Sequence, residues 1–251
     1  MTTRIRIVLL SPHPDDAVWS LGGAIRAWQQ QHDVLVVTIC DGDPDASATE
    51  QVRQEQHRWR SFGDMATRRL EDRQAMDLLG CELLSLGYRD AALRLSPANT
   101  FEYPEAEALF LQPEAARQQQ VSAEMTQRLQ MILHPDDQVI APLGFGGHVD
   151  HCLTHALARH LPQTVAYYAE FPYYHPNQIS ELSSHVAALD LTLTPVDLTC
   201  DWHTWAEASL RYRSQVVRLF RTRARFLDAL SAYAYAGTTP PCCRIWSTRR
   251  I

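Results

Sequence analysis

The chain has 251 residues, of which 45% are hydrophobic and 21% charged, and its formal net charge is −6. This length and composition are typical of a globular protein with a full core, and the negative charge argues against general nucleic-acid binding. No stretch approaches the roughly 18 apolar residues that a membrane helix requires, so we expect no membrane insertion. Six scattered cysteines without a C-x-x-C pair are typical of reduced thiols, which predicts a cytoplasmic protein.

The first predicted strand is an apolar run that ends at Leu10 and is followed by Ser-Pro-His-Pro-Asp-Asp, residues 11–16. Its continuous, β-branched character indicates a strand buried on both faces, and a helical pattern covers about residues 17–31. The two prolines favour an extended backbone around His13. One aspartate is enough to cap the helix, so the second aspartate and the histidine indicate a functional site. Open parallel sheets bind their ligands at such strand ends.

Strands and helices alternate along the rest of the chain. We expect strands at 34–39, 82–85, 138–142, 164–169 and 192–198. We expect helices at 49–62, 70–79, 122–133 and 205–230, and a further helix that begins at the turn before 150 and ends at about 160. Residues 91–120 contain three prolines and are interpreted as a surface insertion, with a lid as one hypothesis. The alternation predicts a single α/β domain over residues 1–251. Its fold is expected to be Rossmann-like, a mostly parallel sheet with helices on both faces.

A second polar cluster follows the strand at 138–142. A glycine-rich turn leads to His148 and His151, and His155 lies one helical turn further, so the three histidines can share a helix face. The pair His151 and His155 has half of the zincin spacing but lacks the glutamate beside the first histidine, which excludes that class. Taken together, His13, Asp16 and His151 offer two histidines and one carboxylate. That is the ligand count of a catalytic zinc site with an open position.

The two clusters carry a resemblance to the PIG-L/LmbE-like family of zinc-dependent N-deacetylases. SPHPDDAVWSLGG and GGHVDH are similar to the family patterns P-H-P-D-D-E and H-x-D-H. The R-x-x-E pattern at 68–71, Leu-Gly at 79–80, LGYRD at 86–90 and YRSQ at 212–215 also match, so the resemblance spans most of the chain. Two positions differ from the family. Ala17 replaces the glutamate after the aspartate pair, and Gly146 stands where some relatives have a tyrosine.

The resemblance implies a resident metal, Zn²⁺ or another divalent ion such as Fe²⁺. By analogy with the family, its ligands would be His13, Asp16 and His151. The other implied roles are a general base (Asp15), an oxyanion donor (His148), a residue that tunes that histidine (Asp150), and sugar contacts (Arg68 and Asp90).

The leading hypothesis is therefore a metal-dependent amidohydrolase that removes an N-acyl group, expected to be acetyl, from an amino sugar or its glycoside. A zinc amidase for another small amide, such as a thiol conjugate, and a catalytically inactive sugar-binding relative are the alternatives. A dinucleotide-binding protein is excluded, because the first strand is not followed by G-x-G-x-x-G. The expected partner is a small N-acylated amino sugar, and a homo-oligomer is left open.

Overall fold

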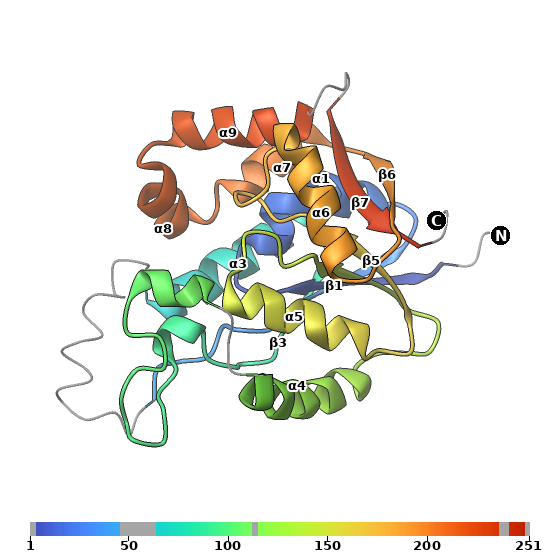
Figure 1. Cartoon of the computed structure of the whole chain (residues 1–251). Helices are drawn as coiled ribbons and strands as arrows, with labels where there is room; N and C mark the ends of the chain where they lie inside the picture. The colour runs from blue at the N-terminus through green and yellow to red at the C-terminus, as the bar shows by residue number, and fades with distance from the viewer. Residues whose placement is uncertain (1–3, 46–63, 112–114, 236–240, 249–251) are drawn as a thin grey trace.

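The computed structural model describes residues 4–45, 64–111, 115–235 and 241–248. These residues form a seven-stranded sheet in the order β3-β2-β1-β4-β5-β7-β6 (Figure 1). The first five strands pair in parallel, whereas β7 is antiparallel to both of its neighbours. The strands are β1 (Arg6–Ser11), β2 (Asp33–Thr38), β3 (Glu82–Ser85), β4 (Gln138–Pro142), β5 (Thr164–Tyr168), β6 (Thr194–Thr199) and β7 (Cys242–Ser247).

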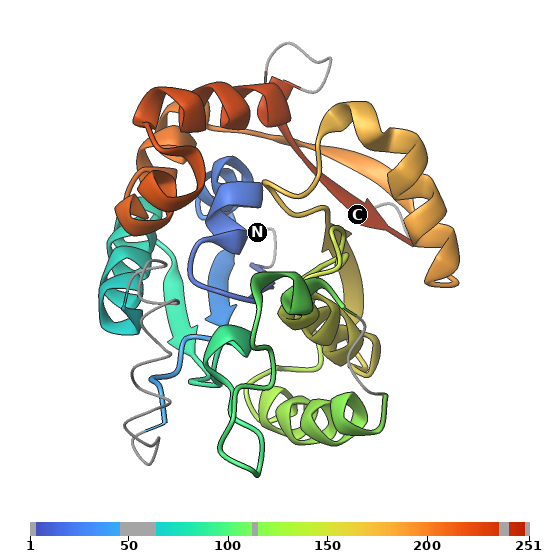
Figure 2. The same cartoon turned by 60° about the vertical axis from the view of Figure 1, so that its left-hand side comes forward.

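Helices cover both faces of the sheet (Figure 2). α1, α3 and α7 pack together on one face, and α4 packs against α5 on the other. The predicted mostly parallel α/β fold with helices on both faces is thus confirmed. The helices are α1 (Asp16–Trp28), α3 (Met65–Leu79), α4 (Ala115–Gln130), α5 (Val149–Arg159), α6 (Ile179–Ala188), α7 (Trp202–Ser209), α8 (Arg213–Gln215) and α9 (Arg223–Tyr235). None of the helices in the described ranges combines the length and hydropathy needed to span a bilayer.

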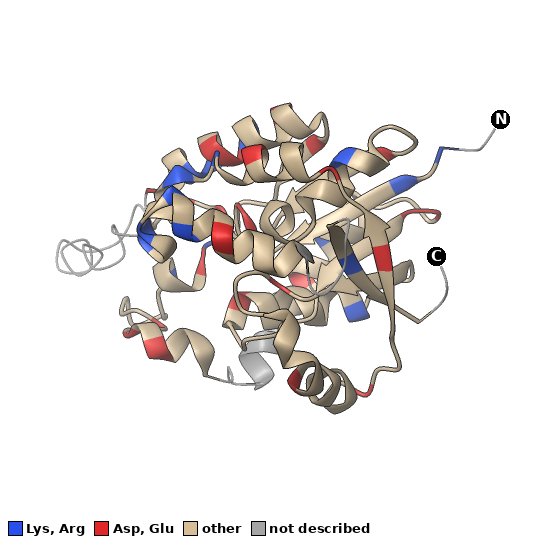
Figure 3. Cartoon of the chain, turned by 90° about the horizontal axis from the view of Figure 1, so that it is seen from above, with Lys and Arg blue, Asp and Glu red and all other residues tan. Residues whose placement is uncertain are grey.

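The apolar character of β1 follows from its central place. β1 pairs with β2 on one side and β4 on the other, and Val8, Leu9 and Leu10 are completely buried. A strand covered on both faces needs no polar alternation, which is why this run is nearly continuous. Charged residues lie mainly on the surrounding helices and loops (Figure 3), and the arginines from Arg213 to Arg225 are exposed.

The predicted helix at 205–230 is wrong as a single element. The chain instead forms α7, α8, a π-helical turn at Val216–Phe220, and α9. Arg221 follows the π turn with φ +66, a left-handed conformation that the interior of a right-handed helix does not contain. The helix expected at 49–62 lies outside the described residues.

The expected surface insertion at 91–120 is more ordered than its prolines suggest. It contains two 3₁₀ helices, Ala91–Leu93 and Ala106–Phe110, and α4 already begins at Ala115. Ala91 is fully buried and packs with Leu109 and the first residue of α5. The segment is therefore attached to the body of the protein at both Ala91 and Leu109. α6 and β7 are further elements that the sequence patterns did not predict.

The sheet has its topological switch point between β1 and β4. From β1 the chain continues through α1 to β2 on one side, and from β4 it continues through α5 to β5 on the other. The two connections diverge and leave a crevice at the carboxyl ends of these neighbouring strands, where open α/β sheets bind ligands. His13 follows β1 and His148 follows β4, so the fold brings both predicted clusters to this crevice.

Candidate metal centre and active site

The turn after β1 is closed by Ser11. Its hydroxyl donates to the carbonyl of His13 at 2.7 Å and accepts from the amide of Ala17 at 3.1 Å. Asp16 is the first residue of α1, and its Oδ2 accepts from the amide of His13 at 2.9 Å. A carboxylate in the first turn also interacts favourably with the positive end of the helix dipole. The N-cap residue is Asp15, which makes no side-chain cap hydrogen bond, so the capping role expected for one aspartate is not observed, and the carboxylate of Asp16 borders the crevice.

Asp15 is held in an unusual conformation. Its φ is +108, a value that costs a non-glycine residue about 1–3 kcal/mol. Arg68 fastens this turn, since it donates to the carbonyl of Pro14 at 3.2 Å and lies 3.6 Å from Oδ2 of Asp15. Burial raises the pKa of the Asp15 carboxyl well above its ordinary value, and the Arg68 charge opposes that rise. A carboxylate with a raised pKa is a stronger proton acceptor once it is ionised.

Glu170 shapes the turn after β4. This fully buried residue accepts hydrogen bonds from the amides of Gly144 at 2.7 Å and Phe145 at 3.2 Å. The same carboxylate lies 3.3 Å from Nδ1 of His151. When Nδ1–H donates to Glu170, the lone pair of the histidine is on Nε2, which lies 3.3 Å from Oδ2 of Asp16. This is how a carboxylate behind a metal-binding histidine fixes its tautomer and orientation.

Asp16 lies between the two histidines of the expected ligand set. Its Oδ2 is 3.2 Å from Nδ1 of His13 and 3.3 Å from Nε2 of His151. Nε2 of His151 is buried and makes no hydrogen bond within the described residues. Two imidazole nitrogens and a carboxylate oxygen that converge in this way suit Zn²⁺ or Fe²⁺. The residues present therefore fit the metal that the sequence resemblance implies.

Within the described residues, two groups of three metal-ligating side chains have their ligand atoms close together, and neither of them contains Asp16. One is His13 with His148 and His151, and the other is His13 with Asp90 and Asp150. In each group the ligand atoms lie within 4.8 Å of one another. Both groups share His13, so they are parts of the same centre and not separate sites.

Burial and the nearby carboxylates have opposite effects on the pKa values of His13 and His151. Burial disfavours a charged imidazole, but Asp16 and Glu170 outweigh this effect and raise the pKa of His151 to about 9. Burial likewise lowers the pKa of His13, yet the surrounding carboxylates, above all Asp90, raise it well above the ordinary value. Protons on these rings thus neutralise a cluster of buried carboxylates. A divalent cation would compete with those protons for the same place.

The carboxylate of Asp150 contacts His13, whereas the sequence resemblance assigned it to His148. Oδ2 of Asp150 lies 2.9 Å from Nε2 of His13 and accepts from the amide of Ala91 at 2.8 Å. Its Oδ1 is ion-paired with Arg94. Asp150 is completely buried, so it links the ring of His13 to the segment that begins at Ala91.

His148 is the N-cap residue of α5. Its Nδ1 accepts from the amide of Asp150 at 3.3 Å, which leaves the ring proton on Nε2. Burial, and then the neighbouring His13 and His151, lower the pKa of His148 to about 3. The ring is therefore neutral near pH 7 and is able to donate one hydrogen bond from Nε2.

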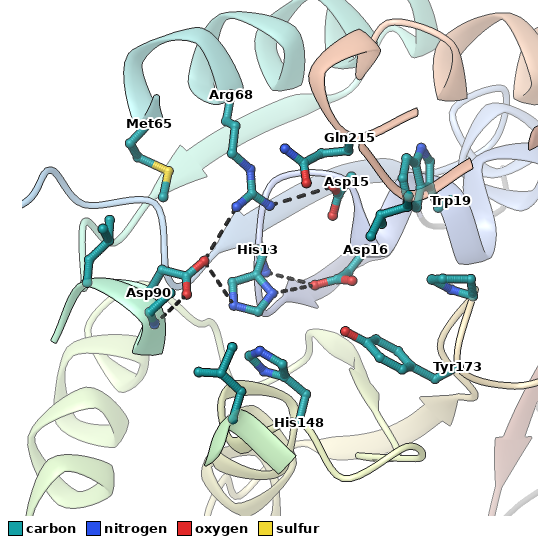
Figure 4. Close-up of a pocket in the computed structure, with 15 residues that line it drawn as sticks. His13, Asp15, Asp16, Trp19, Met65, Arg68, Asp90, His148, Tyr173 and Gln215 are labelled. Carbon is teal, nitrogen blue, oxygen red and sulfur yellow. Dashed lines mark hydrogen bonds and ion pairs between the residues drawn. The ribbon is translucent and has the colours of Figure 1, made fainter. Parts of the chain in front are cut away.

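Arg68 and Asp90 line the same pocket as the histidines (Figure 4). NH1 of Arg68 donates to Oδ2 of Asp90 at 3.4 Å, and Asp90 also accepts from the amide of Ala92 at 3.0 Å. The pocket has a polar side and an apolar side. Its lining residues are His13, Asp15, Asp16, Trp19, Met65, Arg68, Asp90, Ala92, Leu93, Leu109, His148, Pro172, Tyr173, Gln215 and Leu219.

Sequence reasoning assigned no role to four residues at this site: Glu170, Arg94, Tyr173 and Gln215. Glu170, Arg94 and Tyr173 are far in sequence from the side chains that they meet, so no local spacing connects them. A signal existed for Glu170, because it follows the strand at 164–169 and is a carboxylate at a strand end of the kind used for the first cluster. Gln215 was noted only as part of a motif. Arg94 lay within the segment interpreted as an insertion.

The model of the PIG-L family, described as GlcNAc-PI de-N-acetylase, matches residues 8–161. This match covers more than half of the chain and includes both polar clusters. The chain therefore belongs to the PIG-L family.

Individual relatives agree with this assignment. The chain is 30% identical over 179 residues to 2'-N-acetylparomamine deacetylase of Streptomyces fradiae, a match that covers 68% of this chain and 58% of the relative. A crystal structure of the deacetylase in the biosynthesis pathway of teicoplanin is similar with a TM-score of 0.77 and 22% identity, covering 96% of each chain. N,N'-diacetylchitobiose deacetylase from Pyrococcus horikoshii has a TM-score of 0.56 and 21% identity, covering 96% of this chain and 82% of its own. At these identities the structural likeness establishes the shared fold.

Proposed function

We propose that this chain is a zinc-dependent N-deacetylase that hydrolyses the acetamide of an N-acetylated amino sugar or its glycoside. The observation that carries the proposal is the convergence of His13, Asp16 and His151 at a pocket that His13, Asp16, Asp15 and His148 line. Membership of the PIG-L family and similarity to a deacetylase of an N-acetylated aminoglycoside support it. We further propose a single-domain enzyme of the cytoplasm, which agrees with its six free cysteines.

The metal would be held by His13 through Nδ1, by Asp16 through Oδ2 and by His151 through Nε2. Bound zinc supplies a Lewis acid that acidifies water and polarises an amide carbonyl. Glu170 and Asp150 lie behind the two histidines and would keep their rings aimed at the ion. Removal of such supporting carboxylates typically costs about 10–100-fold in metal affinity.

Asp15 is proposed as the general base. It borders the pocket beside Asp16 but is not part of the ligand set, and its raised pKa favours proton uptake from the attacking water. His148, neutral and protonated on Nε2, would donate a hydrogen bond to the carbonyl oxygen as negative charge develops there. A neutral His148 has no additional proton to give, so Asp15 would return its proton to the departing amine nitrogen.

Arg68 and Asp90 are proposed to bind the sugar. They come from the first turn of α3 and from the loop after β3, and their side chains meet at the edge of the pocket away from Tyr173 (Figure 4). A guanidinium and a carboxylate together offer donors and acceptors for vicinal sugar hydroxyls. Since both groups are buried, a ligand that enters the pocket meets them without much intervening water.

The test combines metal analysis with an assay for released acetate. The purified protein is expected to contain about one zinc per chain, and a set of N-acetylated amino sugars and glycosides is expected to include a substrate. His151→Ala should lose both the metal and the activity. Metal-bound protein that cleaves only amides without a sugar would favour the alternative amidase, and metal-bound protein that binds sugars without cleaving them would favour the inactive relative.

A further inference from the structure

Tyr173 is a pocket residue with no role in the mechanism above. It lies in the loop after β5, and its ring makes a T-shaped contact with the ring of His151, with ring centroids 5.1 Å apart and an interplanar angle of 82°. Figure 4 shows its hydroxyl directed into the cavity, toward the space between Asp16 and His148. Within the described residues, this hydroxyl makes no hydrogen bond.

The position of the ring depends on a glycine. Gly146 has φ +92, and a Cβ added there would lie 2.7 Å from Cβ and 2.8 Å from Cγ of Tyr173. Such distances are well inside van der Waals contact, so any larger residue at 146 would displace the tyrosine. The absence of a side chain at Gly146 thus allows the phenol ring to lie against the turn that carries His148.

We propose that the Tyr173 hydroxyl donates a hydrogen bond to the amide oxygen of the substrate as that oxygen acquires negative charge during attack. This inference rests on the proposed deacetylase function and adds a catalytic residue to it. Tyr173 and His148 would then contact the same oxygen from two segments of the chain, the loop after β5 and the start of α5. Asp15, the proposed base, lies on the other side of Asp16 in Figure 4, as expected for a base that acts on the attacking water.

The chemistry of the phenol fits a donor. A phenol has an ordinary pKa of about 10, so the hydroxyl keeps its proton near neutral pH. No proton is transferred in this step. The hydroxyl only strengthens a hydrogen bond as charge builds on the oxygen, and donors of this type typically contribute about 10²–10³ in rate.

A purely structural role predicts a different result from the same substitution. The ring contacts of Tyr173, with Gly146, His151 and Phe110, are made by carbon atoms that phenylalanine also has. Tyr173→Phe should therefore fold and bind zinc as the wild type does. If Tyr173 only packs, the variant should also be fully active.

The experiment compares Tyr173→Phe with the neighbouring Tyr174→Phe. Tyr174 is buried against Phe145 and Trp246 and does not line the pocket, so it is a matched control. Tyr173→Phe is expected to lower kcat by about 100–1000-fold with little change in KM or in zinc content, because the lost bond acts only in the transition state. Tyr174→Phe is expected to retain wild-type kcat.

Wild-type kcat in Tyr173→Phe would overturn the role of Tyr173 and leave the deacetylase proposal intact. A rise in KM with unchanged kcat would also overturn it, since the hydroxyl would then contribute to ground-state binding only. If the wild-type protein itself releases no acetate from any N-acetylated amino sugar, the proposed function is overturned and this inference with it.

Discussion

The carboxylate of Asp150 lies 2.9 Å from Nε2 of His13 and is completely shielded from solvent. The same side chain accepts from the amide of Ala91 and is ion-paired with Arg94. One buried carboxylate therefore joins a proposed metal ligand to the segment that carries Asp90. Because all three of its partners are donors, Asp150 has to be an acceptor at both oxygens.

Asp150→Asn should consequently weaken metal binding. An asparagine has only one acceptor oxygen, so its amide group would face at least one of the donors now held by the carboxylate. We expect zinc affinity to fall by about 10–100-fold, measured as zinc retained during dialysis against graded chelator concentrations. Asp197→Asn is a suitable control, since Asp197 forms a surface ion pair with Arg244. Wild-type affinity in Asp150→Asn would contradict the proposed support of His13.

The neighbours Asp15 and Asp16 are expected to differ when each is changed to asparagine. Asparagine tolerates the positive φ of residue 15, so Asp15→Asn should keep the fold and the zinc. Its activity should fall by roughly 10²–10⁴, as expected for loss of a general base. Asp16→Asn should instead reduce zinc content. Zinc content and turnover of both variants, measured side by side, check this, and the reverse pattern would exchange the two roles.

Arg68→Met tests the proposed sugar contact while keeping most of the aliphatic side chain. We expect KM to rise more than kcat falls, because the guanidinium faces Asp90 at the pocket edge. Arg69→Met is the matched control, since the adjacent Arg69 donates instead to the carbonyl of Asp41 outside the pocket. Steady-state kinetics on one substrate distinguish the two variants. An unchanged KM in Arg68→Met would remove Arg68 from the binding site.

His155 gives a prediction for stability against pH. Its Nδ1 donates to the carbonyl of Pro142 at 3.0 Å, its Nε2 is buried without a partner in the described residues, and burial lowers its pKa to about 4. In the unfolded chain His155 takes up a proton near pH 6.5, whereas in the folded protein its ring stays neutral until the pH falls to about 4. The stabilisation from this neutral ring is therefore present above pH 6.5 and lost as the pH falls, by roughly 3 kcal/mol at pH 4.

His155→Gln keeps a donor for Pro142 and cannot be protonated in this range. Urea unfolding at pH 7 and pH 4 should show a smaller loss of stability in this variant than in the wild type. His160→Gln, at an exposed position near the end of the same helix, should behave like the wild type. An identical pH dependence in wild type and His155→Gln would contradict the assignment.

Sequence patterns predicted the parts of this molecule that depend on neighbouring residues. The apolar runs gave β3 and β4 with the observed boundaries, and the polar clusters that follow β1 and β4 meet in one pocket. The order of the strands was not predicted, because pairing depends on packing between distant segments. β7 was not predicted either, because its sequence CCRIWS is short and includes a charged residue.

In the candidate site, too, some contacts depend on neighbouring residues and others on distant segments. His13, Asp15 and Asp16 share one turn, so their proximity could be predicted from the local sequence. The contact between Asp150 and Arg94 joins residues that are far apart along the chain and depends on how the segment after β3 folds back onto α5. The position of Tyr173 against Gly146 likewise requires two loops from different strands to meet.

The placement of β7 between β5 and β6 has a consequence for biosynthesis. β6 pairs in the described part of the chain only with β7, which is translated after α7, α8 and α9. A nascent chain therefore carries an unpaired β6 and an open edge on β5 until its last described strand emerges from the ribosome. Premature termination before Cys242 would leave both edges exposed, and unpaired edges promote aggregation. Shortened products should thus be recovered as insoluble material or degraded, even though every proposed metal ligand precedes the break.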